Sequence, residues 1–213
     1  MTAGHCLCTG IGDDLFKPTS LRVTLSQHDL SDKSTDAYER PVRSFNIHPH
    51  YSCSRSSNDI AILELDGHVT WSDSVIPACL PTERSSQLDN LLATVAGWGW
   101  THEHSSKGGR AKTLQKAKVN VIGVEKCKSW YESQGKKTKV QPNQICAGHE
   151  LGGIDACWAD SGGPLMVETT TDNQMMVVGV VSTGVGCARP YLPGIYTRVS
   201  GYIPWIRSVI GRS

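Results

Sequence analysis

Short apolar runs recur along the whole chain, and polar or glycine-rich turns separate them. Leu21–Leu25 and Leu114–Val121 alternate between apolar and polar positions, which is the period of a half-buried β-strand. Asn58–Leu65, Leu91–Trp98 and Met175–Val181 are more continuously apolar, as strands inside a sheet are. Further strands are expected in Arg43–Tyr51, from Ile145 onward and in Ile195–Val199. This pattern predicts a mainly β protein.

Four segments depart from the strand pattern. Val124–Tyr131 is a candidate short helix, and Tyr202–Ile210 places its apolar residues on one helical face. Ser26–Arg40 and Glu103–Lys112 are polar, and we expect both to be surface loops. Many short strands followed by one terminal helix favour an all-β barrel or sandwich over alternating strands and helices.

Composition narrows the class of protein. The chain has 213 residues and a net charge of +1, which gives no reason to expect a nucleic-acid or membrane partner. No stretch of the sequence is long enough for a transmembrane helix, and the N-terminus has no signal-peptide pattern. Eight cysteines nevertheless favour an oxidising, extracellular compartment.

The segment Asp155–Pro164 presents a candidate nucleophile. Ser161 lies between Asp160 and a Gly-Gly-Pro turn, and glycines allow backbone conformations that expose a hydroxyl. A serine activated for nucleophilic attack needs a neighbouring base, and the base needs a group that orients it. His5, in a turn of small residues, and Asp59, at the start of a strand, are candidates for these two roles.

The order His5, Asp59, Ser161 is one of the orders in which a catalytic triad occurs. Six motifs accompany it: Thr-Ala-Gly-His-Cys, Asn-Asp-Ile-Ala, Gly-Trp-Gly, Ile-Cys-Ala-Gly, Asp-Ser-Gly-Gly-Pro and Pro-Gly-Ile-Tyr-Thr-Arg-Val. Together they resemble the chymotrypsin/trypsin-type serine proteases over essentially the whole chain. Taken singly, a turn serine, a strand-edge aspartate or a lone histidine is more often structural than catalytic.

The resemblance implies an all-β fold of two packed, antiparallel six-stranded β-barrels, with the active site in the cleft between them. We expect residues 1–90 to form part of the first barrel, 91–200 the second barrel and 201–213 the C-terminal α-helix. The family's first strands have no counterpart here. The chain 1–213 is therefore expected to be a protease domain that lacks its N-terminal segment, from a larger secreted zymogen.

The resemblance also implies the roles of the triad. Ser161 attacks the peptide carbonyl, His5 takes its proton and later gives it to the leaving amine, and Asp59 holds the imidazole. The backbone N–H groups of Ala159 and Ser161 form the oxyanion hole, worth about 3 kcal/mol per donor in such sites. The family usually has glycine at the position of Ala159, so its Cβ weakens the hole if the backbone there disfavours alanine.

Asp155 matches the base of the family's primary substrate pocket. A buried carboxylate needs a cationic partner, which the side chain of a substrate Arg or Lys supplies. Gly184 and Gly194 match the glycines that keep this pocket open, and Ser182 matches a residue that lines the cleft. Thr183 replaces the family's usual tryptophan. The expected activity is cleavage of proteins or peptides after Arg or Lys, with no cofactor.

The resemblance also helps to assign the cysteines. The family's bridges imply two pairs, and the two cysteines left over near the cleft predict a third: Cys127–Cys146, Cys157–Cys187 and Cys8–Cys53. The third bridge would join the loop after His5 to the loop before Asp59. Cys6 matches a family position whose partner lies ahead of the catalytic histidine. Cys79 matches a position that in many members holds a disulfide-linked pro-region.

Activity of the chain by itself is a separate question. In the family, proteolysis frees an N-terminal ammonium that pairs with the aspartate before the nucleophile, here Asp160. Met1 is not a substitute for the Ile or Val that usually carries this ammonium. Without the pair we expect the oxyanion donors and the substrate pocket to be poorly ordered, and the isolated chain to have little activity.

Three functions stay open on the sequence alone. The first is a secreted Arg/Lys-specific endopeptidase, with protein inhibitors as further partners. The second is a non-catalytic protease homologue that acts as a binding or regulatory module, which Ala159 leaves open. The third is a cysteine-rich structural protein, which leaves the triad unexplained. A metal site at His48, His50 and Cys53 fits no common zinc spacing, and Gln27 stands where calcium-binding members have Glu, so no metal is expected.

Overall fold

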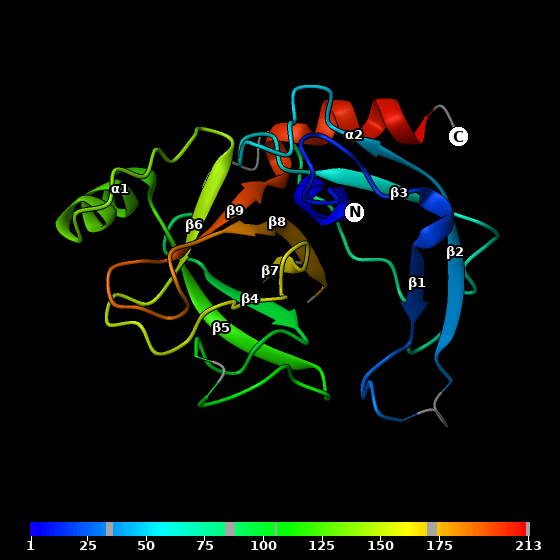
Figure 1. Cartoon of the computed structure of the whole chain (residues 1–213), viewed down its shortest axis with the longest axis horizontal. Coiled ribbons are helices and arrows are strands. Elements are labelled where there is room, and N and C mark those ends of the chain that lie inside the picture. The colour runs from blue at the N-terminus through cyan, green and yellow to red at the C-terminus, as the bar shows by residue number, and fades with distance from the viewer. Residues whose placement is uncertain (33–35, 84–87, 105, 170–173, 212–213) are drawn as a thin grey trace.

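The chain folds into two groups of antiparallel strands. The computed structural model describes residues 1–32, 36–83, 88–104, 106–169 and 174–211. Figure 1 shows a three-stranded sheet on one side and a closed six-stranded barrel on the other. The sheet has the order β1-β2-β3, formed by Arg22–Leu25, Tyr38–Ile47 and Ala61–Leu65.

The barrel closes in the order β4-β5-β6-β9-β8-β7. Its strands are Leu92–Gly97 (β4), Gln115–Ile122 (β5), Gln144–Gly148 (β6), Pro164–Glu168 (β7), Met175–Thr183 (β8) and Gly194–Arg198 (β9). The predicted all-β class, with a six-stranded antiparallel barrel and a C-terminal helix, is confirmed. Among the described residues, the first half of the chain forms an open sheet of three strands.

Helices are short and lie between or after the strands. They are η1 (Gly4–Leu7), η2 (Pro18–Ser20), α1 (Val124–Ser133), η3 (Val199–Tyr202) and α2 (Ile203–Ile210). Pro204 lies in the first turn of α2, where its missing N–H costs no helical hydrogen bond. The region predicted as the helical tail extends to residues 212 and 213, which lie outside the described residues. Within the described part of the chain, no helix is long and apolar enough to cross a membrane.

One predicted boundary is wrong. Ser26–Arg40 was expected to be a loop, but β2 begins at Tyr38 and pairs with β1, with Tyr38 opposite Leu25. Glu39 and Arg40 carry the charges that give this segment its polar pattern. Cross-strand pairing at an open edge therefore decides the structure here, since backbone hydrogen bonds form whatever the side chains are. Residues 33–35 of the expected loop lie outside the described residues.

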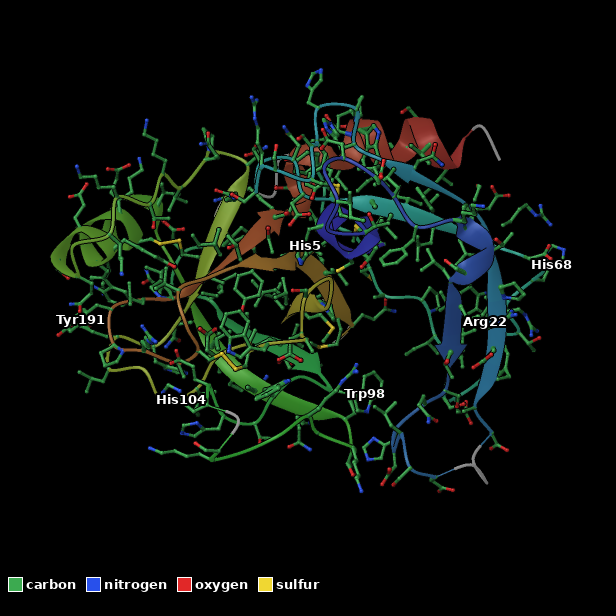
Figure 2. The ribbon with its side chains drawn as sticks, in the orientation of Figure 1. His5, Arg22, His68, Trp98, His104 and Tyr191 are labelled. Atoms are coloured by element: carbon green, nitrogen blue, oxygen red, sulfur yellow. A yellow bond between two sulfur atoms is a disulfide. The ribbon has the colours of Figure 1, made fainter. Side chains whose placement is uncertain are left out.

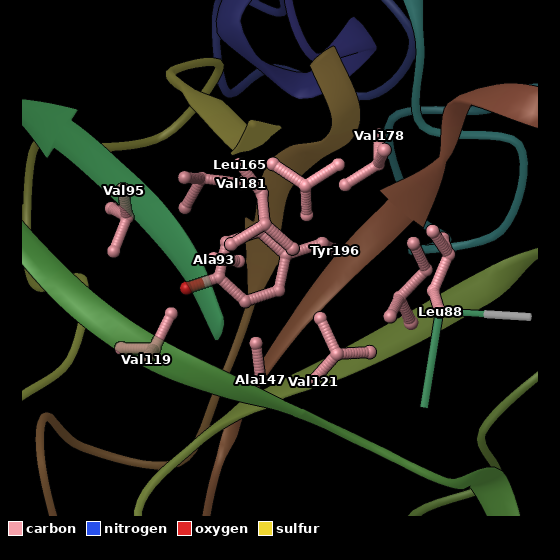
Figure 3. Packing of buried hydrophobic residues seen from close by; sticks show 12 residues of the cluster. Leu88, Ala93, Val95, Val119, Val121, Ala147, Leu165, Val178, Val181 and Tyr196 are labelled. Carbon is pink, nitrogen blue, oxygen red and sulfur yellow. The ribbon is translucent and has the colours of Figure 1, made fainter. Parts of the chain in front are cut away.

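The interior of the barrel is filled by alternating residues from all its strands. Figure 3 shows the ring of Tyr196 surrounded by aliphatic side chains, among them Leu165 and Val181. Tyr196 and Leu165 have no exposed surface. Such packing makes the barrel the more rigid part of the molecule and a firm support for the loops that leave it.

A second cluster joins the sheet to the barrel. It contains Ala3 and Ile60 from the first half of the chain, Val180 of β8, and Tyr202 and Ile206 near the C-terminus. An isolated bridge between Thr2 and Ala61 holds the first residues against the start of β3. Figure 1 shows the N-terminal segment between the two groups of strands, beneath α2. The joint therefore fixes the position of the candidate histidine.

Candidate active site

His5 and Asp59 meet where the sheet adjoins the barrel. His5 lies on η1, near the centre of the molecule in Figure 2, and Asp59 lies two residues before β3. The His5 Nδ1 atom is 2.7 Å from Asp59 Oδ2, and the His5 backbone N–H donates to Oδ1 at 2.8 Å. Both carboxylate oxygens are used, so the carboxylate fixes the imidazole and its backbone together.

The carboxylate of Asp59 is held by the barrel. Only 1% of Asp59 is exposed. The Ser182 hydroxyl of β8 donates to Asp59 Oδ2 at 2.5 Å, and the Thr197 hydroxyl of β9 donates to the Asp59 carbonyl at 2.7 Å. The sequence predicted Ser182 as a cleft residue but gave no sign of its bond to Asp59 or of Thr197. Both are ordinary strand residues in the sequence, and only the approach of the sheet to the barrel reveals their contacts.

The protonated form of His5 is stabilised in this setting. The hydrogen bond to Asp59, followed by a contact with the side chain of Cys6, raises the pKa of His5 above its ordinary value. Burial of the imidazole opposes the shift but is the smaller effect. A raised pKa strengthens His5 as a proton acceptor, since it stabilises the imidazolium that forms when the nucleophile is deprotonated.

Ser161 lies in a tight turn next to the His5 segment. Gly162 follows it with φ +81°, and a Cβ at Gly162 would lie 2.2 Å from Thr2 Oγ1 and 3.1 Å from Cys6 Sγ. Only glycine allows both this backbone conformation and this close approach. Ser161 is exposed, and His5, Ser161 and Asp155 line one cavity of about 240 Å³. Among the described contacts, none is a hydrogen bond between Ser161 and His5.

Ala159 has a left-handed backbone conformation, with φ +69°. An L-residue other than Asn, Asp or His is uncommon in this region, because its Cβ approaches the following backbone. On the sequence alone, Ala159 weakens the oxyanion hole only if its backbone disfavours alanine. The positive φ shows that it does. The Ala159 N–H lies shortly before Ser161 in the chain, as the expected oxyanion role requires. Alanine is strained in this conformation, whereas glycine would adopt it without strain.

Asp160 is held by backbone donors of this chain. Gly99 N–H donates to Asp160 Oδ1 at 2.8 Å, and Cys157 N–H donates to Oδ2 at 2.9 Å. A Cβ at Gly97 or at Gly99 would lie 2.0 Å or 2.3 Å from Asp160 side-chain atoms. The Gly-Trp-Gly motif thus makes room for Asp160, a reason that the sequence alone did not supply. The expected pairing of Asp160 with an ammonium group stays a prediction.

Asp155 is a half-buried residue that lines the candidate pocket. Its burial raises the pKa to about 7, and the backbone N–H groups of Ala156 and Ala188 partly oppose the shift. The Ala156 bond is 2.8 Å long. The fully buried Tyr196 ring lies beside this carboxylate. A group in this position releases its proton readily when a cation approaches, because a positive charge offsets the desolvation of the carboxylate.

The two predicted pocket glycines have different surroundings. A Cβ at Gly194 would lie 3.0 Å from Asp155 Oδ1, so a side chain there would cover the carboxylate. A Cβ at Gly184 would meet no atom closer than 3.8 Å, so this glycine leaves the mouth of the pocket open. Both residues line the cavity that contains His5 and Ser161.

The three predicted disulfides are all present: Cys8–Cys53, Cys127–Cys146 and Cys157–Cys187. The first joins the loop after His5 to the loop before Asp59. The third ties the nucleophile turn to the loop between β8 and β9. Cys6 and Cys79 are unpaired in the described chain, and the Cys79 thiol donates to Gln174 Oε1 at 2.9 Å.

The disulfide at Cys53 removes the metal site weighed for His48, His50 and Cys53, since a disulfide sulfur is not available as a thiolate ligand. The His48 ring instead packs edge-on against Tyr202 and Trp205. Burial lowers the pKa of His48, which suits a packed, neutral ring.

Comparisons with known proteins agree with this geometry. The sequence model of the family described as Trypsin matches residues 1–206. The chain is 36% identical to serine proteinase stubble of Drosophila melanogaster, over 96% of this chain and 25% of that protein. It is 34% identical to trypsin-1 of Astacus astacus, over 98% of this chain and 82% of that protein. It is 35% identical to the proclotting enzyme of Tachypleus tridentatus, over 97% of this chain and 54% of that protein.

Proposed function

The chain belongs to the trypsin family of serine proteases, and on that premise we propose that it is the catalytic part of an endopeptidase that cleaves after Arg or Lys. The observation that carries the proposal is one cavity of about 240 Å³ lined by His5, Ser161 and Asp155. A proton acceptor, a nucleophile and a buried carboxylate at such a cavity suit acyl transfer on a substrate with a cationic side chain.

The proposed reaction has two halves. Ser161 Oγ attacks the peptide carbonyl, and its proton passes to Nε2 of His5, whose Nδ1 is held by Asp59. The imidazolium then gives this proton to the leaving amine, which leaves an acyl-enzyme. In the second half, His5 takes a proton from water, the hydroxide oxygen attacks the acyl carbon, and the proton returns to Ser161 Oγ.

The negative oxygen of the tetrahedral intermediate is assigned to the N–H groups of Ala159 and Ser161. Donors that are already oriented stabilise the charge as it forms, because no reorganisation is then needed. The positive φ of Ala159 supports an N–H direction that glycine would provide with less strain.

Specificity is assigned to Asp155. A substrate Arg or Lys that enters between Gly184 and Gly194 would bring its charge to this carboxylate, where burial makes an unpaired negative charge unfavourable. Selectivity then arises because neutral side chains leave the carboxylate without a partner.

A non-catalytic homologue that acts as a binding or regulatory module is the second candidate. The observation that favours it is the strained Ala159 in place of glycine at the oxyanion hole. The intact arrangement of His5 and Asp59 favours the protease, since a binding module has no need of a buried carboxylate aimed at an imidazole.

Labelling with a fluorophosphonate separates these two candidates. The reagent reacts with a serine only when its hydroxyl is activated, so the protease hypothesis expects label on Ser161 in the full-length, activated protein. Ser161→Ala should take up no label. Ser26→Ala changes a surface serine that is far from Ser161 in the sequence, and this variant should label like the wild type. Full-length, activated protein that stays unlabelled would favour the binding module.

The remaining assignments are also proposals. Peptides cut after Arg or Lys, and not after neutral residues, would test the specificity of Asp155. Protein inhibitors of trypsin-type enzymes are proposed partners. Cys79, unpaired in the described chain and half-buried, is proposed as the attachment point of a disulfide-linked pro-region, and the three disulfides favour an extracellular location.

A further inference from the structure

The loop between β8 and β9 carries an ion pair that no sequence motif predicts. Arg189 of this loop faces Glu103, which lies in the loop between β4 and β5. The guanidinium donates from Nε to Glu103 Oε2 at 2.9 Å and from Nη2 to Oε1, so the contact is bidentate. The Glu103 side chain is only 15% exposed. Two parallel charge-assisted bonds fix the orientation of both groups as well as their separation.

The ion pair is connected to the substrate pocket through two successive backbone N–H groups. The N–H of Cys187 helps to lower the pKa of the Glu103 carboxyl. The N–H of the next residue, Ala188, acts on the Asp155 carboxyl and partly offsets the rise of its pKa. The Ala188 carbonyl also accepts a bond from Gly153 N–H at 2.9 Å. A displacement of this loop from Glu103 would therefore also change the backbone donors around Asp155.

The backbone of the same loop needs external support. Ala188 and Tyr191 have φ +54° and +57°, in the left-handed region that side chains disfavour. Gly186, with φ +72°, lies directly against the ion pair: a Cβ there would be 2.4 Å from Arg189 Nε and 2.7 Å from Glu103 Oε1. A loop with this conformation persists only when its surroundings fix it.

Little else fills the space between the two loops. Glu103, Arg189 and Asp155 line one cavity of about 630 Å³, so packed side chains do not join the loops at this place. The Cys157–Cys187 disulfide and backbone bonds such as Gly153 N–H to the Ala188 carbonyl tie the loop between β8 and β9 to the loop between β6 and β7. Toward the loop between β4 and β5, the side-chain tie in the described part of the chain is the ion pair.

We propose that Glu103 and Arg189 are positioning residues for the cation-binding pocket. Their ion pair holds the loop between β8 and β9 so that the N–H of Ala188 points at Asp155 and the mouth of the pocket keeps its width. Neither residue touches the substrate. The proposal rests on the proposed function, because it takes Asp155 as the group that binds the substrate's Arg or Lys.

The test is binding of p-aminobenzamidine, a fluorescent arylamidinium ion, to the full-length, activated protein and to four variants of it: Glu103→Gln, Arg189→Gln, Arg189→Lys and the charge exchange Glu103→Arg with Arg189→Glu. Each single Gln variant should bind the amidine about 3- to 10-fold more weakly, the range of a partly exposed bidentate ion pair. Arg189→Lys keeps the charge but loses the fork and should be intermediate. The charge exchange should bind more tightly than either Gln variant.

Two controls separate positioning from general loss of structure. Arg43→Gln removes an exposed arginine that pairs with Glu64 and Asp66 on the three-stranded sheet, and it should leave amidine binding unchanged. The rate of fluorophosphonate labelling at Ser161 should also be unchanged in the Glu103 and Arg189 variants, because this reagent does not need a cation at Asp155. For an Arg substrate, KM should rise while kcat stays nearly constant.

The outcomes are distinguishable. Wild-type protein that binds the amidine, with variants that bind it equally well, would overturn the positioning role and leave the proposed function standing. Labelling of Ser161 that falls in parallel with amidine binding would also overturn it, since the ion pair would then support the whole site. Full-length, activated wild-type protein that does not bind the amidine would overturn the Arg/Lys pocket, and the positioning role with it.

Discussion

The barrel and the three-stranded sheet contribute to the candidate site in different ways. The barrel is closed, contains a core of fully buried side chains, and carries two of the three disulfides. The sheet is open, and its β1 strand alternates between exposed and half-buried residues. Ser161 and Asp155 belong to loops of the barrel, whereas His5 and Asp59 belong to the sheet side. Asp59 is nevertheless buried by Ser182 and Thr197 of the barrel.

This difference indicates that the barrel supports both halves of the site. The nucleophile and the pocket follow from its own loops and strands. The proton acceptor and its partner are positioned because the barrel donates hydrogen bonds to Asp59 and shares a core cluster with the N-terminal segment. The positions of the catalytic side chains can therefore be well defined although the sheet is open, because the buried Asp59 is hydrogen-bonded to the more rigid barrel.

The largest expected effect tests whether the sheet side is needed for chemistry. Asp59→Asn should reduce the rate of an Arg-peptide hydrolysis about 10⁴-fold, the loss usual for such triads, because the amide favours the wrong tautomer of His5. Rates under saturating substrate would measure it. Glu64→Gln, at a partly exposed residue of β3, is the control and should act like the wild type. A similar rate for Asp59→Asn would mean that the reaction does not need the Asp59 carboxylate.

The next prediction concerns the pocket on the barrel side. Asp155→Asn should weaken p-aminobenzamidine binding by about 100-fold, since the buried site loses the charge that pairs with the cation. In the wild type, amidine affinity should rise as the pH passes about 7, because the carboxylate ionises there. Fluorescence titrations from pH 5 to pH 9 would measure both effects. An affinity that does not change with pH would contradict the assignment.

The same substitution should stabilise the fold. The pKa of Asp155 is raised to about 7, so the native state retains a proton that the unfolded chain has lost, and stability falls as the pH rises toward 7. Asp155→Asn removes this penalty and should raise the free energy of unfolding by roughly 1–3 kcal/mol above pH 7, with little change near pH 4. Urea denaturation at both pH values would measure it; equal stabilities throughout would count against a buried carboxylate.

The next expected effect in order of size compares the packing of the barrel with that of the three-stranded sheet. Leu165→Ala in the barrel should cost about 3–4 kcal/mol of unfolding free energy, because a fully buried side chain leaves a cavity in close packing. Leu63→Ala in the half-buried β3 strand should cost about 1–2 kcal/mol, because solvent already reaches part of the site. Thermal unfolding of both variants would measure the difference. Equal costs would show that the sheet is as tightly packed as the barrel.

The smallest expected effect concerns the strained residue. Ala159→Gly should relieve a positive φ and raise the rate of acylation a few-fold, with a gain of about 1 kcal/mol or less in stability. Burst kinetics with an arginyl ester would measure it, and Ala78→Gly, at an exposed alanine without a positive φ, is the control. A lower rate in Ala159→Gly would mean that the alanine serves the site better than glycine.

Much of the molecule could be predicted from the sequence because its signals are local. Period-2 patterns predicted β1 and β5, more continuous apolar runs predicted β3, β4 and β8, and a helical face predicted α2. The order of His5, Asp59 and Ser161, together with the motifs around them, indicated the family, and the cysteine pairs followed from it. The failure at Tyr38 has a physical cause: the polar first residues of β2 are stabilised by backbone pairing with β1, which leaves no pattern in their side chains.

Tertiary structure alone decided how the predicted residues are held. The sequence contains Ser182 and Thr197, but only the packing of β8 and β9 against the sheet brings their hydroxyls to Asp59. It contains Gly97 and Gly99, but only the fold shows that Asp160 occupies the space that they leave. Glu103 and Arg189 lie far apart in the chain and match no motif. The sequence by itself determines the residue types and the local structure, whereas contacts between distant segments form only when the barrel closes.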